Sequence, residues 1–265
     1  MAITFLQISD LGPSTTLLTS TNKLLFFPLL STLILRTCRG IDILPFLDNF
    51  TPPSLTSLSL DFGCLSGLNY QAIENLALRS SCSLTSLTLR GMAKQDAVKC
   101  FELPCLRSIE RLNLNMVHVN NGLVALLVYP DASSTLHDRR GIFPWHKKLS
   151  LEWCMAEDGA TSRVVASRWR DKSAPSDKSG SVPASLEELE VVFRQDPCTG
   201  ATCHDVDMAA LTSFAKRGLA LTYQLASSTP RYQQHPADFC RNCCYHSRYP
   251  DLGPCYHPRL PYLDF

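Results

Sequence analysis

The sequence predicts an α/β fold, a solenoid with a curved parallel sheet inside and helices outside. Two observations predict it: the pattern Leu-x-x-Leu-x-Leu recurs along the chain, and stretches with helical spacing lie between the copies. The alternation Leu-x-Leu puts both leucines on one face of a short strand and the residue between them on the other. Because one such unit cannot bury its apolar side, neighbouring copies must stack.

Five copies of the pattern are present. They are Leu30-Ser-Thr-Leu33-Ile-Leu35, Leu55-Thr-Ser-Leu58-Ser-Leu60, Leu84-Thr-Ser-Leu87-Thr-Leu89, Ile109-Glu-Arg-Leu112-Asn-Leu114 and Leu186-Glu-Glu-Leu189-Glu-Val191. The middle leucines of the first four copies are 25, 29 and 25 residues apart, a spacing typical of leucine-rich repeats, which are roughly 20 to 29 residues long. The last step, from Leu112 to Leu189, is 77 residues. It leaves room for two degenerate copies, one of them at Leu149-Ser-Leu151.

Helical stretches separate the strands. In the first, Ile73, Leu76 and Ala77 fall at helical spacing and no breaker interrupts the pattern. The stretches cover residues 70–79, 95–101, 122–128, 161–169 and 206–216. Strand and helix therefore alternate once per repeat, which predicts a leucine-rich-repeat-like solenoid with the strands on its concave face.

Composition divides the chain into three parts. Residues 1–22 are polar and Ser/Thr-rich, and we expect a loose N-terminal cap. Residues 23–225 hold the solenoid, within which residues 170–185 are rich in Ser, Pro and charge and predict a mobile loop. Residues 226–265 are rich in Pro, Tyr, Cys and His without an amphipathic period, and predict a disordered tail.

Charge and hydropathy narrow the class of partner. Lys plus Arg is 25 against 24 for Asp plus Glu. Because the chain has almost no net positive charge to attract nucleic acid or an anionic membrane, we expect neither as a partner. The longest apolar run, residues 24–35, is interrupted by Pro28 and is shorter than the roughly 20 residues of a membrane span. The N-terminus lacks a signal-peptide pattern, so we expect a cytoplasmic or nuclear protein whose 12 cysteines are mostly buried free thiols.

The tail contains a candidate metal site. Cys240 and Cys243 have the Cys-x-x-Cys spacing that lets two thiolates bind one zinc ion, and Cys255 and His257 would complete a tetrahedral set. However, Cys-x-His is an unusual second ligand pair for a zinc site, and prolines surround it. A disordered or mis-spliced tail is the alternative interpretation.

Catalytic patterns are weak. The chain contains no Gly-Lys-Ser/Thr phosphate loop and no Gly-x-Ser-x-Gly elbow. Adjacent Cys203, His204 and Asp205 suggest a metal site or a nucleophile. Neighbours on an extended chain point apart, however, and a loop with Asp205 as the N-cap of the next helix is the favoured interpretation. Adjacent Glu157 and Asp158 suggest acid/base chemistry or a turn that leads into a helix. We expect no enzyme and no cofactor.

The predicted concave face carries the candidate binding residues. They are the residues that alternate with the leucines, and most are small or polar: Thr32, Ile34, Arg36, Ser57, Ser59, Asp61, Ser86, Thr88, Arg90, Arg111, Asn113, Asn115, Glu188 and Glu190. This composition suits a protein partner that lies across the strands. A solvated sheet face without a ligand is the alternative.

Three stretches resemble a known family. They are Ile43-Leu-Pro-Phe-Leu with Pro53-Ser-Leu-Thr-Ser-Leu-Ser-Leu60, then Leu78-Arg-Ser-Ser-Cys-Ser-Leu-Thr-Ser-Leu-Thr-Leu89, and Val165-Ala-Ser-Arg-Trp-Arg170 followed by Ser185-Leu-Glu-Glu-Leu-Glu190. Together they make residues 24–224 similar to the leucine-rich portion of F-box proteins of mushroom-forming fungi. The resemblance implies the substrate-recognition arm of a ubiquitin ligase, in which the F-box passes the bound protein to a cullin and its adaptor.

The sequence departs from that family at its start. An F-box is a helical module that precedes the repeats and opens with a Leu-Pro-x-Glu type motif, and none is visible before Leu30. We therefore expect either a truncated gene product or a protein that works without an F-box.

Overall fold

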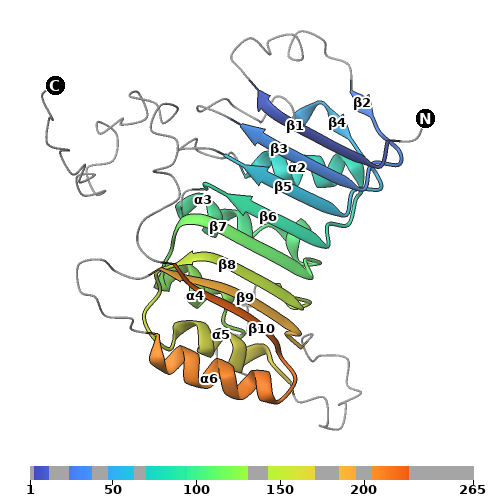
Figure 1. The fold of residues 1–265 in the computed structure, drawn as a ribbon. Coiled ribbons are helices and arrows are strands. Elements are labelled where there is room, and N and C mark those ends of the chain that lie inside the picture. The colour runs from blue at the N-terminus through green and yellow to red at the C-terminus, as the bar shows by residue number, and fades with distance from the viewer. Residues whose placement is uncertain are drawn as a thin grey trace, which may run out of the picture. The chain divides into compact units, whose positions relative to one another are not determined.

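The structure is a computed structural model, and it describes residues 3–11, 24–37, 47–62, 70–92, 94–130, 143–170, 185–194 and 204–226. The chain divides into two units, residues 1–228 and 229–265, and every described residue belongs to the first. The fold is mixed α/β, with an eight-stranded parallel sheet and helices on one side of it (Figure 1). Within the described ranges, no helix combines the length and apolar character that crossing a membrane requires.

The strands of the main sheet lie side by side in chain order, and each pairs in parallel with the next. They are β1 (Phe5–Leu11), β3 (Thr32–Thr37), β5 (Ser57–Asp61), β6 (Ser86–Arg90), β7 (Arg111–Val119), β8 (Lys148–Cys154), β9 (Glu188–Arg194) and β10 (Ala220–Ala226). Two short strands, β2 (Leu25–Phe26) and β4 (Phe50–Thr51), form a second parallel sheet.

Helices return the chain from the end of one strand to the start of the next, as parallel pairing requires. They are α2 (Gln71–Ser80), α3 (Lys94–Phe101) with the 3-10 turn η2 (Pro104–Leu106), α4 (Asn121–Leu127), α5 (Ala160–Arg168) and α6 (Asp205–Lys216). All five helical stretches expected from the sequence are confirmed, each to within one residue at either end.

Two rows of apolar side chains cross the sheet on the side of the helices. One row is Leu33, Leu58, Leu87, Leu112, Leu149 and Leu189, and the other is Leu35, Leu60, Leu89, Leu114, Leu151 and Val191. Each of these side chains is at most 2% exposed. They form one core with buried helix residues such as Ile73, Val124 and Val165. Since burial of one such side chain stabilises the fold by about 1.5–3 kcal/mol, the two rows contribute a large part of its stability.

A repeated backbone pattern holds the strands in register. Two successive N–H groups at the start of a strand donate to one carbonyl oxygen of the strand before it. Thr85 and Ser86 donate to the Thr56 carbonyl at 2.9 and 3.0 Å, and Glu110 and Arg111 donate to the Thr85 carbonyl at 2.8 and 3.0 Å. The same arrangement joins β7 to β8 and β8 to β9. Each shared carbonyl places the leucines of adjacent strands directly opposite one another.

Two arginines at helix C-termini tie each helix to the segment before it. In α2, Arg79 donates from Nη2 to the Leu47 carbonyl at 2.6 Å and from Nε to the Phe50 carbonyl at 3.1 Å. In α5, Arg168 donates from Nε to the Leu127 carbonyl at 2.6 Å and from Nη1 to the Phe143 carbonyl at 2.8 Å. The Arg168 side chain is fully buried, and that burial lowers its pKa to about 10, so it remains a cation at neutral pH.

The structure corrects the expected number of repeats. Strand β8 pairs with both β7 and β9. One degenerate copy, at Leu149-Ser-Leu151, therefore fills the 77-residue step, and the second expected copy is absent from the sheet. Long connections, residues 120–147 and 155–187, flank that strand on either side.

The ends of the sheet also differ from the sequence prediction. Residues 5–11, within the expected loose cap, form β1 and pair with β3. Strand β10 follows α6, where no strand was expected. Most of the expected mobile loop and nearly all of the expected disordered tail, residues 171–184 and 227–265, lie outside the described residues.

Replacement of Arg168 by Ala should lower the free energy of unfolding by about 3 kcal/mol, because buried carbonyl groups of Leu127 and Phe143 lose their donors. Urea unfolding followed by circular dichroism measures the change. Arg170→Ala, at an exposed position two residues further on, is the matched control and should cost less than about 0.5 kcal/mol. Equal losses in the two variants would contradict the bridging role of Arg168.

His146 makes stability depend on pH. Its side chain is fully buried, and burial, together with the neighbouring Arg168 cation, lowers its pKa to about 3. The ring Nε2 lies 2.7 Å from the Lys148 carbonyl and donates to it in the neutral form. Between about pH 3 and 6.5 only the unfolded state takes up this proton, so stability falls as the pH drops below about 6.5.

The His146 contribution to the free energy of unfolding should fall by about 2 kcal/mol between about pH 7.5 and pH 5. His146→Gln keeps a donor for the Lys148 carbonyl but does not titrate. Urea unfolding at several pH values should therefore show a shallower loss in the variant by that amount. Parallel curves for the two proteins would exclude this titration.

Candidate functional site

The side of the main sheet that faces away from the helices is lined by polar side chains, and we call it the polar face. Strand register arranges its residues in three rows. The first is Thr32, Ser57, Ser86, Arg111, Lys148 and Glu188; the second is Ile34, Ser59, Thr88, Asn113, Ser150 and Glu190; the third is Arg36, Asp61, Arg90, Asn115 and Glu152. All are partly or fully exposed, whereas the alternating leucines are buried.

All fourteen residues selected from the sequence lie on the polar face. The selection missed Lys148, Ser150 and Glu152 of β8, the strand between β7 and β9, which lie in the same three rows. A signal for them was present, because Leu149-Ser-Leu151 shows the alternation of a repeat strand. The first leucine of the pattern is missing from that copy, since His146 stands three positions before Leu149.

Charges on the polar face form pairs across strands. Arg90 of β6 lies 3.9 Å from Glu152 of β8, so this ion pair spans the intervening strand. Asn115 of β7 lies between them and donates from Nδ2 to the second Glu152 oxygen. Partial burial raises the pKa of Glu152 and nearby Glu190 adds to the rise, against the lowering effects of Arg90 and Asn115. The three residues therefore form a network that closes one edge of the face.

A shallow hollow of about 100 Å³ lies across β6 to β9 on the polar face. Its polar lining comes from the first and second rows: Ser86, Thr88, Arg111, Asn113, Lys148, Ser150, Glu188 and Glu190. Lys148 forms an ion pair with Glu188, and Ser150 donates to Glu190 Oε2 at 3.2 Å. The hollow thus has hydroxyl and cationic groups toward β6 and β7 and carboxylates on β9.

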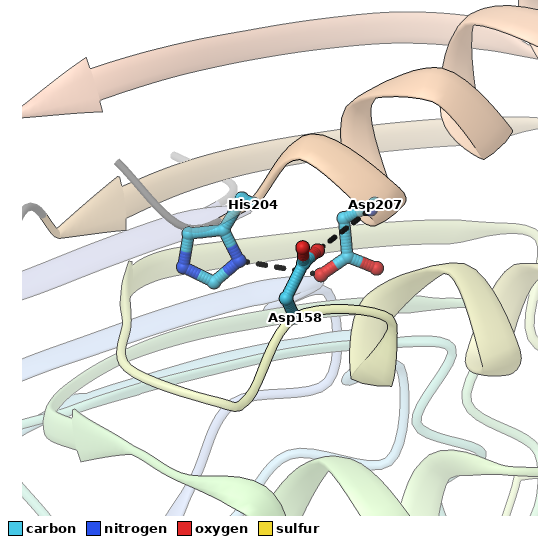
Figure 2. A group of neighbouring side chains, drawn as sticks. All are labelled: Asp158, His204 and Asp207. Atoms are coloured by element: carbon cyan, nitrogen blue, oxygen red, sulfur yellow. Dashed lines mark hydrogen bonds and ion pairs between the residues drawn. The ribbon is translucent and has the colours of Figure 1, made fainter. Parts of the chain in front are cut away.

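A second cluster lies at the N-termini of α5 and α6. Asp158, His204 and Asp207 place one ligand atom each within 4.8 Å of one another, a geometry that could hold a metal ion. Figure 2 shows the three side chains turned toward one another, with Asp158 on the loop before α5 and the other two at the start of α6. His204 Nδ1 is 3.3 Å from Asp207 Oδ2.

Hydrogen bonds within this cluster explain it as a reciprocal helix cap. The N–H groups of Val206 and Asp207 in α6 donate to the Asp158 carboxylate at 3.0 and 2.8 Å. In return, the Ser162 N–H in α5 donates to Asp207 Oδ1 at 2.7 Å. Each carboxylate therefore satisfies otherwise unpaired N–H groups at the start of the neighbouring helix.

The hydrogen bonds of this cluster contradict the predicted N-cap at Asp205 and fit the predicted turn at Asp158. Asp205, expected as the N-cap of the last helix, is its first helical residue, and His204 precedes it without a side-chain cap. Asp158, from a different segment, takes that role. Burial acts to raise the pKa of Asp207, but its hydrogen bonds with His204, Ser162 and Gly159 outweigh burial and lower the pKa. A structural role for Asp158 fits the predicted turn before a helix.

The described cysteines are free, and none is an activated nucleophile. Burial raises the pKa of Cys100 to about 12 and that of Cys105 to about 11. Burial also raises the pKa of Cys82 and Cys154. These four thiols remain protonated at neutral pH, as expected of cysteines that serve as small apolar residues.

No family model, curated protein or solved structure matches the chain.

The zinc set expected from the tail, Cys240, Cys243, Cys255 and His257, lies outside the described residues. The polar face and the cap cluster are therefore the two arrangements that the described part of the chain offers. Because the cap cluster is explained by helix termini, the polar face is the better candidate for a functional site.

Replacement of Asp158 by Ala should cost about 1–2 kcal/mol of unfolding free energy, because two N–H groups of α6 lose their acceptor. Glu157→Ala, at the exposed neighbouring position, is the control and should change stability by less than about 0.5 kcal/mol. The thermal midpoint of the unsubstituted protein should not respond to excess EDTA. An EDTA-induced fall in the midpoint of the unsubstituted protein that is absent from Asp158→Ala would show that a metal binds at this cluster, against a purely capping role.

Proposed function

We propose that the chain is a non-enzymatic protein-interaction solenoid of the leucine-rich-repeat type, whose polar face binds another protein. The observation that carries this proposal is the polar face itself. Three rows of partly or fully exposed, mostly polar side chains cross five or six strands in register, directly above a leucine core. No described helix or loop covers these rows.

The repeat architecture supports the solenoid interpretation. Eight parallel strands follow one another in chain order, and a helix separates most consecutive pairs. Each unit contributes leucines to shared rows and packs on its neighbours, as stacked repeats do. In such an arrangement the polar face is the concave surface, which is extended enough for a partner to contact several strands.

The charge pattern favours a protein over a nucleic acid as the partner. The three rows hold four cations, Arg36, Arg90, Arg111 and Lys148, and four anions, Asp61, Glu152, Glu188 and Glu190. A surface that binds a phosphate backbone needs an excess of positive charge, which is missing on this face. Mixed charge instead gives specificity toward a complementary protein surface.

The resemblance to F-box proteins extends the proposal to ubiquitin ligases. In this extension, the polar face recognises a substrate protein, and the chain associates with a cullin and its adaptor. The two family-like stretches that contain Arg79 and Arg168 have one role in the fold, in which each arginine bridges carbonyl groups of the preceding segment. That shared role supports the repeat assignment, whereas the ligase role rests on the resemblance alone.

A double substitution, Ser59→Arg with Thr88→Arg, tests the binding surface. Both residues lie in the second row on adjacent strands, so two added cations disrupt the face while the leucine core remains intact. Tagged full-length protein is purified from the cells that produce it, and bound proteins are quantified by mass spectrometry. We expect recovery of specific partners to fall by about tenfold or more, as loss of central contacts predicts.

The matched control is Ala209→Arg with Ser213→Arg, which adds the same two cations to exposed positions of α6. Partners recovered equally with both double variants would exclude the polar face as the binding surface. Circular dichroism should show that both variants remain folded. Recovery of a cullin and its adaptor supports the ligase extension, and recovery of other partners without them restricts the protein to a binding scaffold.

A further inference from the structure

We infer that the hollow on the polar face selects a protein segment that presents one acidic and one basic side chain about 12 Å apart, the acidic one over Arg111 and the basic one over Glu190. This inference rests on the proposed function and adds the chemistry of the partner. It depends on which charges of the hollow are already neutralised within the chain and which are free to pair with another molecule.

The cationic end of the hollow is open for an incoming anion. Arg111 of β7 is exposed, and among the described residues no carboxylate pairs with it. Beside it on β6, the hydroxyl groups of Ser86 and Thr88 have no hydrogen-bond partner within the described part of the chain. A guanidinium with two adjacent hydroxyl donors suits a carboxylate, which accepts two parallel hydrogen bonds from arginine.

The anionic end is open for an incoming cation. Glu190 of β9 is exposed, and Ser150 donates to only one of its oxygens, Oε2. Between the two ends, Lys148 and Glu188 neutralise each other in an ion pair. Both oxygens of Glu152 are likewise in use, one facing Arg90 and the other accepting from Asn115. The unneutralised charges that line the hollow are therefore Arg111 and Glu190, with opposite signs.

Strand geometry sets the distance between these two charges. Arg111 and Glu190 are two strands apart and differ by one row, or two residues along a strand. With strands about 4.8 Å apart and about 3.3 Å per residue, their Cα atoms are about 12 Å apart. Among the described ion pairs, none joins Arg111 to Glu190. Their Cα separation is close to the roughly 13 Å between side chains i and i+4 of an extended segment, which point to the same side.

The experiment starts from a phage-displayed library of random dodecapeptides selected on the immobilised full-length protein. Enriched peptides are labelled, and their dissociation constants are measured by fluorescence polarisation. We expect enriched peptides to share an acidic and a basic residue at a fixed spacing. Arg111→Glu and Glu190→Lys should each weaken binding by about tenfold or more, because each reversal replaces an attraction with a repulsion.

Charge reversal in the peptide provides the decisive comparison. A peptide whose acidic residue is changed to Lys should bind Arg111→Glu protein better than unsubstituted protein. Lys216→Glu in α6 and Glu102→Lys after α3 are the controls, since both reverse an exposed charge away from the polar face. These two variants should bind the original peptides within about twofold of the unsubstituted protein.

Two contrary outcomes are distinguishable. Peptides that lose binding to the Ser59→Arg, Thr88→Arg protein but bind the Arg111 and Glu190 variants normally would overturn this inference and leave the proposed function in place. A selection that yields no peptide dependent on the polar face would overturn both.

Discussion

The in-register stacking of leucines across parallel strands is the constraint on which the rest of this structure depends. One strand presents two leucines on the helix side, and the corresponding leucines of its neighbours cover them together with buried helix residues. A shift of one residue would turn those leucines to the polar face and bury charged side chains in their place. The paired N–H groups that share one carbonyl at each strand start, such as those of Thr85 and Ser86, oppose such a shift.

Parallel stacking requires return connections, and two arginine side chains supply hydrogen-bond donors to the carbonyl groups of these connections. Connections that pass beneath the sheet leave carbonyl groups in an apolar environment, where an unpaired acceptor is costly. Arg79 and Arg168, in the last turns of α2 and α5, each satisfy two such carbonyls of the preceding segment. An arginine suits this position because its planar fork reaches two acceptors at once.

The sequence predicts what depends on periodicity and misses what depends on contacts between distant segments. The leucine spacing identified β3, β5, β6, β7 and β9, and with them the order of three rows on the polar face. Strand β1 was missed although Ile3, Leu6 and Ile8 follow the same spacing, because isoleucine replaces leucine at two of the three positions. The reciprocal cap of α5 and α6 was also missed, since Asp158 and Val206 are 48 residues apart. No local pattern links an acceptor to a donor at that separation.

The same constraint that buries the leucines determines the chemistry of the opposite face. Because register is fixed, each residue between two leucines has defined neighbours, so Arg90, Asn115 and Glu152 meet in one row from three separate repeats. Their pairing neutralises one edge of the polar face, and the Lys148–Glu188 pair neutralises charges within the hollow. Substitutions on this face change its charge without disturbing the core beneath. Under the proposed function, the specificity of the polar face therefore lies in the charges that remain unpaired.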